Sequence, residues 1–142
     1  MTQKNMINTD SDKNGFLHRE ITDKILKCFY KVYNTLGYGF LEKVYERAMM
    51  IEFDLIGLKY VNQSSMEVLY FGYNIGYFNS DFLVEEKVIV ELKARETLIK
   101  DDPLQLINYL KSSYLEVGLL LNFGKKPEAK RMIFTNDRKK SV

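Results

Sequence analysis

The chain contains one cysteine, Cys28, and one histidine, His18, among its 142 residues. A single cysteine excludes a disulfide within the chain, and one cysteine with one histidine excludes a Cys/His zinc site. A catalytic pair of a cysteine or serine with a histidine is also excluded unless His18 is its base, and His18 lies in a polar region. Cys28 has apolar neighbours, which favours a place in the core. A reducing compartment fits this composition, and we expect a cytoplasmic protein.

Long apolar runs are also missing, because no run approaches the roughly 20 residues that a membrane-spanning helix needs. The first residues, "MTQKNMINTDSDKNG", are polar, so we expect no secretory signal. The net charge is only +2, but residues 125–142 hold seven basic and two acidic residues and so carry +5, which leaves −3 for the rest. Such an end can follow the phosphates of a nucleic acid. A solvated basic end is the simpler interpretation, and we adopt it.

The length predicts one compact domain, and a hydrophobic content of 46% is enough to fill its core. We predict a flexible leader over residues 1–17, a single domain over residues 18–136 and a basic tail over residues 137–142. The leader is rich in Asn, Asp, Lys and Thr, which favours disorder. We find no internal repeat, no linker and no separate domain for reading DNA.

Helical periodicity follows the leader in two apolar stripes. The first consists of Ile21, Ile25, Cys28, Phe29, Val32 and Leu36. The second consists of Leu41, Val44, Tyr45, Ala48, Met49 and Leu55, and Gly57 ends it. Lys43 and Glu46 indicate that this second helix also has a wet side. A third helix is predicted at "DDPLQLINYLKSS", with Asp102 as its N-cap, Pro103 as its first residue and an apolar side made by Leu104, Ile107 and Leu110.

The remaining segments are rich in Val, Ile, Tyr and Phe and predict five strands, over residues 65–71, 74–84, 87–94, 116–124 and 131–136. The fourth is continuously apolar, as a fully buried strand is, and the fifth is expected beside it. "EEK" at 85–87 reads as a hairpin turn, and a three-residue turn places Asp81 opposite Glu91 and Val84 opposite Val88. This order of elements predicts an α/β domain, bordering on α+β, with a mixed central sheet flanked by helices.

The stretch "VIVELKA" at 88–94 combines an apolar strand with two charges, Glu91 and Lys93, which share one face because strand side chains alternate. Asp81 across the hairpin adds a second carboxylate. Two adjacent carboxylates repel unless a cation joins them, and Mg²⁺ or Mn²⁺ prefers such oxygen ligands. A lysine beside the ion can hold a phosphate oxygen or help a water attack, so the pattern suits phosphodiester hydrolysis. A surface ion pair on the wet face of a sheet remains the alternative from spacing alone.

Other segments relate this hairpin to a known family. "GFLEKVYE" at 39–46, with Gly39, Glu42 and Tyr45, resembles the signature of the GxxExxY proteins, which are similar to the PD-(D/E)XK nuclease superfamily. The "LGYG" turn, "SDFLVE", "VIVELKA", "QLINYL" and "GLLLNFG" resemble further landmarks of that family in the same order. The resemblance covers roughly residues 19–135 and implies a restriction-endonuclease-like core.

The resemblance also implies roles for individual residues. Asp81 and Glu91 match the metal-binding carboxylates, to which the backbone carbonyl of Leu92 can add a ligand, and Lys93 matches the catalytic lysine. Glu42 matches an acid that the first-layer helix contributes, although an exposed helix acid is the alternative. Gln105 matches a helix glutamine that faces the active site, although a plain surface residue in the first turn of its helix is the alternative. Tyr109 lies one turn after Gln105 on the same helix face, and helical spacing therefore places it at the pocket rim. Tyr45 is a second candidate for the rim, although core packing suits it better than a chemical role. Tyr33 departs from the family, whose members often carry a histidine there.

The resulting expectation is a nuclease that depends on Mg²⁺ or Mn²⁺ and hydrolyses DNA or RNA. One alternative is a catalytically silent module of the same fold that binds nucleic acid or protein, which the weak overall positive charge supports. Another is a structural oligomer with an interface built from Tyr60, Tyr70, Tyr73 and Tyr77. We expect no membrane partner, and a homodimer would suit cleavage of two strands.

Overall fold

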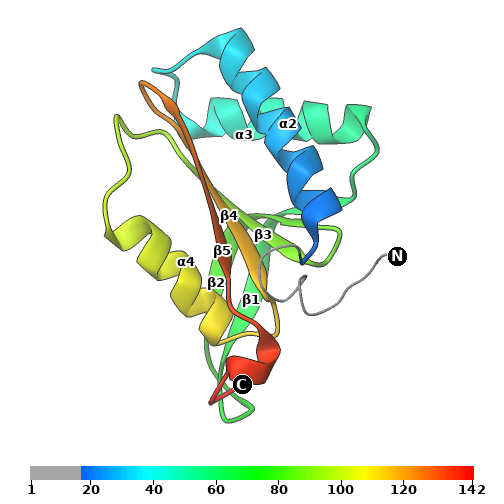
Figure 1. The fold of residues 1–142 in the computed structure, drawn as a ribbon, viewed down its shortest axis with the longest axis vertical. Helices are drawn as coiled ribbons and strands as arrows, with labels where there is room; N and C mark the ends of the chain where they lie inside the picture. Colours follow the sequence, from blue (N-terminus) through cyan, green and yellow to red (C-terminus); the bar gives the residue numbers. More distant parts are fainter. Residues whose placement is uncertain (1–16) are drawn as a thin grey trace.

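The computed structural model describes residues 17–142, so the predicted leader lies, apart from Leu17, outside the described residues. Figure 1 shows a twisted sheet with helices on both sides. Its elements in chain order are α2 (Arg19–Leu36), α3 (Glu42–Leu55), β1 (Tyr60–Tyr70), β2 (Tyr73–Val84), β3 (Val88–Lys93), α4 (Asp101–Lys111), β4 (Val117–Phe123), β5 (Pro127–Ile133) and the 3₁₀ helix η2 (Asn136–Arg138). The three predicted helices and five predicted strands are all present in the predicted order.

The five strands form one sheet in the order β1-β2-β3-β4-β5. Only β3 and β4 pair in parallel, and the other neighbours are antiparallel. A parallel pair needs a crossover, and α4 supplies it between β3 and β4. Every residue of β4 is buried, as its continuous apolar run predicts. The predicted α/β class and mixed sheet are thereby confirmed.

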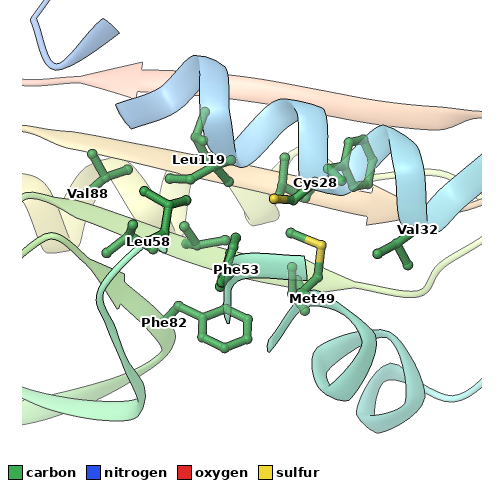
Figure 2. Packing of buried hydrophobic residues seen from close by; sticks show 14 of the residues in the cluster. Cys28, Val32, Met49, Phe53, Leu58, Phe82, Val88 and Leu119 are labelled. Carbon is green, nitrogen blue, oxygen red and sulfur yellow. The ribbon is translucent and has the colours of Figure 1, made fainter. Parts of the chain in front are cut away.

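Two hydrophobic clusters lie on opposite sides of the sheet. The larger one packs α2 and α3 against the sheet, and Figure 2 shows Phe53 and Met49 of α3 close to Cys28 of α2 and Leu119 of β4. The smaller one packs Leu106 and Leu110 of α4 against the other side. In Figure 1, α4 accordingly stands apart from α2 and α3.

The hairpin between β2 and β3 has the predicted register, because Val84 pairs with Val88. The turn consists of residues 85–87, and its first two residues, Glu85 and Glu86, have φ angles of 53° and 59°. Left-handed backbone is uncommon for residues other than glycine. The turn is closed by the N–H of Lys87, which donates to the carbonyl of Val84 over 3.0 Å. This register brings Asp81 and Glu91 to the same level of the sheet.

Two strand boundaries were predicted wrongly. β1 begins at Tyr60 rather than at residue 65, because Tyr60 already pairs with Val84 although the polar "NQSS" breaks the apolar pattern. β5 covers 127–133 rather than 131–136, because it is an edge strand that pairs with β4 from Pro127 onward. Edge strands carry charge and proline readily, so an apolar pattern does not mark where they begin.

The apolar faces of two helices also differ from prediction. In α4, Leu106 and Leu110 are buried whereas Leu104 is 53% exposed, because the helix turns the i, i+4 pair toward the sheet. In α3, Tyr45, Met49 and Phe53 are buried, whereas Val44 and Leu55 are exposed, as is Leu41 just before the helix.

Asp102 is not the N-cap of α4, since the helix begins at Asp101. Its carboxylate is 5% exposed and instead accepts the N–H of Ile99 over 3.1 Å and contacts Arg95 at 3.1 Å. The aspartate therefore closes the loop in front of α4.

The C-terminal residues contact the body of the domain. The ammonium of Lys139 donates to the carbonyls of Ser113 and Leu115, over 2.8 and 2.6 Å. The carbonyl of Ser141 accepts the N–H of Phe71 at the tip of the β1–β2 hairpin. None of the helices within residues 17–142 combines the length and apolar character that a membrane crossing requires.

Candidate active site

Asp81 and Glu91 converge where the backbone pairing of β2 with β3 ends, next to the pair Phe82 and Val90. Side chains continue the pairing from that point. The N–H of Asp81 donates to Oε1 of Glu91 over 3.1 Å, and the N–H of Leu92 donates to Oδ2 of Asp81 over 2.7 Å. The two carboxylates are therefore fixed to each other's strand at one end of the hairpin.

Both carboxylates lie in surroundings that disfavour negative charge. Burial and the charge of Asp81 raise the pKa of Glu91 from 4.5 to about 7. Burial also raises the pKa of Asp81, and the charge of Glu46 adds to the shift, while the N–H of Leu92 and the charge of Lys93 act against it. Like charges in a partly buried place repel, so a cation between them would relieve the repulsion.

Glu42 lies beside this pair, as the first residue of α3. Partial burial and the charge of Asp81 raise the pKa of Glu42, and the charges of Lys93 and Arg95 act in the opposite direction. The positive end of the α3 dipole also favours an acid in this first turn. The structure thus brings Glu42, Asp81, Glu91 and Lys93 into one electrostatic neighbourhood.

Lys93 also lines a cleft of about 400 Å³, which lies between the end of β3 and α4. Gln105 and Tyr109 line the same cleft. The amide of Gln105 donates to the hydroxyl of Tyr109 over 3.2 Å, and the ring of Tyr109 stacks on Phe78 with centroids 3.9 Å apart. Gln105, suggested by the family resemblance, and Tyr109, placed by helical spacing, therefore share a cleft with Lys93.

Two other tyrosines lie outside the cleft. Tyr45 is fully buried, its hydroxyl donates to the carbonyl of Gly37 over 2.7 Å, and its ring stacks on Phe123 at 4.1 Å. Tyr45 therefore does not line a pocket rim, because its side chain has no exposed surface, and the core position expected for it is confirmed. Tyr33 contacts the carbonyls of Gly124 and Lys125 through its hydroxyl, at 2.7 and 2.8 Å. It joins α2 to the turn after β4.

Arg95 lines the cleft beside Lys93, and the sequence did not single it out. Asn122 of β4, which has no exposed surface, holds the backbone of Arg95 from both sides. Its Oδ1 accepts the N–H of Arg95 over 2.9 Å, and its amide donates to the carbonyl over 3.1 Å. The guanidinium contacts Asp102 at 3.1 Å. The sequence signal for this clamp is Asn122 itself, a polar residue within the apolar run "GLLLNFG". A polar residue in a buried strand needs hydrogen-bond partners.

Glu46 was assigned to a wet helix side, and this interpretation is wrong. Only 5% of Glu46 is exposed, and its Oε2 accepts amide hydrogens from Asn62 and Gln63, each over 2.6 Å. Because β1 was expected to begin at residue 65, neither amide residue was placed in a strand near Asp81. Helical periodicity alone cannot distinguish a solvated glutamate from one with partners on another element.

The donor set fits a divalent ion in part. Asp81 and Glu91 offer hard carboxylate oxygens, which suit Mg²⁺ or Mn²⁺. Within residues 17–142, however, no three Asp, Glu, His or Cys side chains form a group that could hold a metal on its own. A bound ion would thus need a backbone carbonyl or water molecules to complete its coordination.

These features define an α/β domain with paired carboxylates and a lysine at the end of a strand hairpin, next to a cleft bounded by a helix. A family model of the PD-(D/E)XK nuclease superfamily matches residues 19–132, and the chain belongs to this superfamily. The restriction-endonuclease-like core implied by the resemblance agrees with this assignment. The match is to the superfamily, so membership of the GxxExxY proteins stays a prediction. Searches of curated proteins and of solved structures found no match.

Proposed function

We propose that the protein is a metal-dependent nuclease that hydrolyses phosphodiester bonds of DNA or RNA. The observation that carries the proposal is the convergence of Asp81 and Glu91 beside Lys93, which opens into the cleft. Membership of the superfamily supports nuclease chemistry in general. The buried free Cys28 is consistent with a cytoplasmic protein, which remains our prediction.

Asp81 and Glu91 would hold a divalent ion, Mg²⁺ or Mn²⁺, with the carbonyl of Leu92 as a third protein ligand. The N–H and C=O of one strand residue point to the same side, and the N–H of Leu92 points to Asp81. Its carbonyl therefore points toward the same neighbouring strand, β2, which supports this assignment. When bound, the ion would lower the pKa of a water molecule and polarise the phosphate.

The remaining side chains act on the substrate. The ammonium of Lys93 donates a hydrogen bond to a phosphate oxygen and offsets the negative charge that builds up in the transition state. Glu42 accepts a hydrogen bond from the attacking water and orients it. Gln105 and Tyr109 contact the nucleotide beside the scissile phosphate, from the α4 wall of the cleft.

The proposal is tested by incubating the purified full chain with labelled single- and double-stranded DNA and RNA, in Mn²⁺, Mg²⁺ or EDTA. We expect cleavage of at least one substrate with metal and none in EDTA. Lys93→Met should lower the rate about 100-fold or more, as removal of a transition-state donor does. Lys87→Met is the matched control, since Lys87 is exposed in the turn of the same hairpin. If the wild type cleaves none of the four substrates with either metal, the proposed function is wrong.

A further inference from the structure

A second set of polar side chains lies behind Asp81, on the side away from β3. At its centre is Glu46, whose Oε2 accepts the amides of Asn62 and Gln63, while Oε1 contacts the ammonium of Lys43 at 3.2 Å. Burial alone would raise the pKa of Glu46, but the hydrogen bonds from Gln63, Asn62 and Lys43 lower it overall. Glu46 is therefore a buried, ionised carboxylate with three donors.

The two amides connect Glu46 to Asp81. The amide nitrogen of Asn62 also donates to the backbone carbonyl of Asp81 over 3.0 Å, and that of Gln63 donates to its Oδ1 over 3.3 Å. Each amide nitrogen carries two hydrogens and donates one to Glu46 and one to Asp81, so neither nitrogen has a hydrogen left over. The backbone and the carboxylate of Asp81 are thereby held from the side of β1.

The backbone of β1 is irregular at this point. Gln63 has a φ of 56°, in the left-handed region, although it lies inside a strand. The strand pairs continue from Asn62 with Phe82 to Ser64 with Ser80 and leave out Gln63 and Asp81. Unfavourable backbone in residues other than glycine persists where the surrounding contacts enforce it, and it gathers at functional sites. Here it directs the amide of Gln63 toward Asp81.

We infer that Glu46 is a positioning residue, which orients the carboxylate of Asp81 toward a divalent ion through Gln63 and Asn62. Oδ1 of Asp81 is held by Gln63 of β1 and Oδ2 by the N–H of Leu92 of β3, so the carboxylate cannot rotate freely. Residues that orient a ligand in this way typically contribute about 10- to 100-fold to metal affinity. The inference rests on the proposed function, because it requires that Asp81 binds the metal.

The test is calorimetric titration of Mn²⁺ into the full-length wild type and four variants, with the folded fraction of each measured by circular dichroism. Glu46→Ala and Gln63→Ala should each weaken Mn²⁺ binding about 10- to 100-fold. Glu46→Gln should restore affinity close to the wild type, because its amide oxygen can still accept both hydrogen bonds. Lys43→Ala should change affinity by less than about fivefold, since it removes only the exposed partner of the same carboxylate.

The titrations distinguish the positioning role of Glu46 from the metal site itself. If the wild type binds Mn²⁺ and folded Glu46→Ala and Gln63→Ala bind it equally well, the positioning role is wrong while the metal site stands. An equal loss in Glu46→Gln and Glu46→Ala would mean that the charge of Glu46 acts alone, which also overturns the inference. If the wild type itself binds no Mn²⁺, the metal site of the proposed function fails and the inference fails with it.

Discussion

At the scale of single residues, Glu91 lies in surroundings that disfavour its negative charge. It lies on β3 between Val90 and Leu92, both buried, and its carboxylate shares one end of the hairpin with Asp81. A half-buried carboxylate beside a second carboxylate lowers the stability of the fold, and the charge of Lys93 offsets this only in part. Such a residue is expected where function requires it. A metal ion bound by Glu91 and Asp81 would offset the repulsion between their charges, which is why we propose that Glu91 is a metal ligand.

The raised pKa of Glu91 makes stability depend on pH. A carboxyl group with a pKa of about 7 in the folded state and about 4.5 when unfolded favours folding below pH 4.5. This contribution is lost as pH rises through 7. The free energy of unfolding of Glu91→Gln and of the wild type should therefore be measured in urea with EDTA at pH 5 and at pH 8. The difference between the two proteins should shift in favour of Glu91→Gln by roughly 1–3 kcal/mol from pH 5 to pH 8, because one pKa unit corresponds to about 1.4 kcal/mol. An equal difference at both pH values would contradict the assigned environment of Glu91.

The same pKa affects metal binding. Because a metal must displace the proton from Glu91, the affinity for Mn²⁺ should rise with pH and level off above about pH 7. Between pH 6 and pH 8 we expect the dissociation constant to fall about tenfold, measured by calorimetry and corrected for buffer protonation. A dissociation constant that stays flat over this range would show that Glu91 is not a ligand.

At the scale of elements, the loop after β3 is positioned by β4. Asn122 holds the backbone of Arg95, and Gly124 lies so close that a Cβ there would be 2.5 Å from the carbonyl oxygen of Arg95 and 2.6 Å from that of Glu96. Both oxygens belong to the backbone and cannot yield as a side chain can. The cleft wall that carries Arg95 thus depends on Gly124, which lies in the turn after β4.

Gly124→Ala should therefore destabilise the protein by about 1–3 kcal/mol, as overpacking does, and should move the loop that carries Arg95. Thermal unfolding measures the first effect, and the Michaelis constant for the cleaved nucleic acid measures the second. Gly76→Ala is a suitable control, because a Cβ there meets no atom within 4 Å. Equal stability and equal Michaelis constants for the two variants would contradict the close packing at Gly124.

The sequence predicts elements well where local chemistry decides them. The three-residue turn and the alternation of side chains were enough to pair Val84 with Val88, which places Asp81 level with Glu91. Glu46 could not be placed in this way, because its burial depends on the amides of β1, which are distant in the sequence. The Asn122 clamp likewise connects strand and loop across 27 positions. Contacts between distant elements are not encoded in periodicity.

At the scale of the whole molecule, the site lies where β2 passes between the two hydrophobic clusters. Phe78 belongs to the cluster under α4, and Phe82 belongs to the cluster under α2 and α3. Residues four apart in a regular strand share a face, so β2 must change faces between them. Asp81 lies at this change, opposite the irregular Gln63. The whole layered fold, rather than one motif, therefore orients the carboxylate.

The central claim is that Asp81 and Glu91 together bind a divalent ion, and metal-dependent stabilisation tests it most directly. A ligand that binds only the folded state stabilises it, by about 2.7 kcal/mol at 100 times its dissociation constant. We predict that Mn²⁺ at pH 8 raises the unfolding temperature of the wild type and leaves that of the Asp81→Asn, Glu91→Gln double variant unchanged. An unfolding temperature that Mn²⁺ does not raise in the wild type, or raises equally in the double variant, would contradict the account.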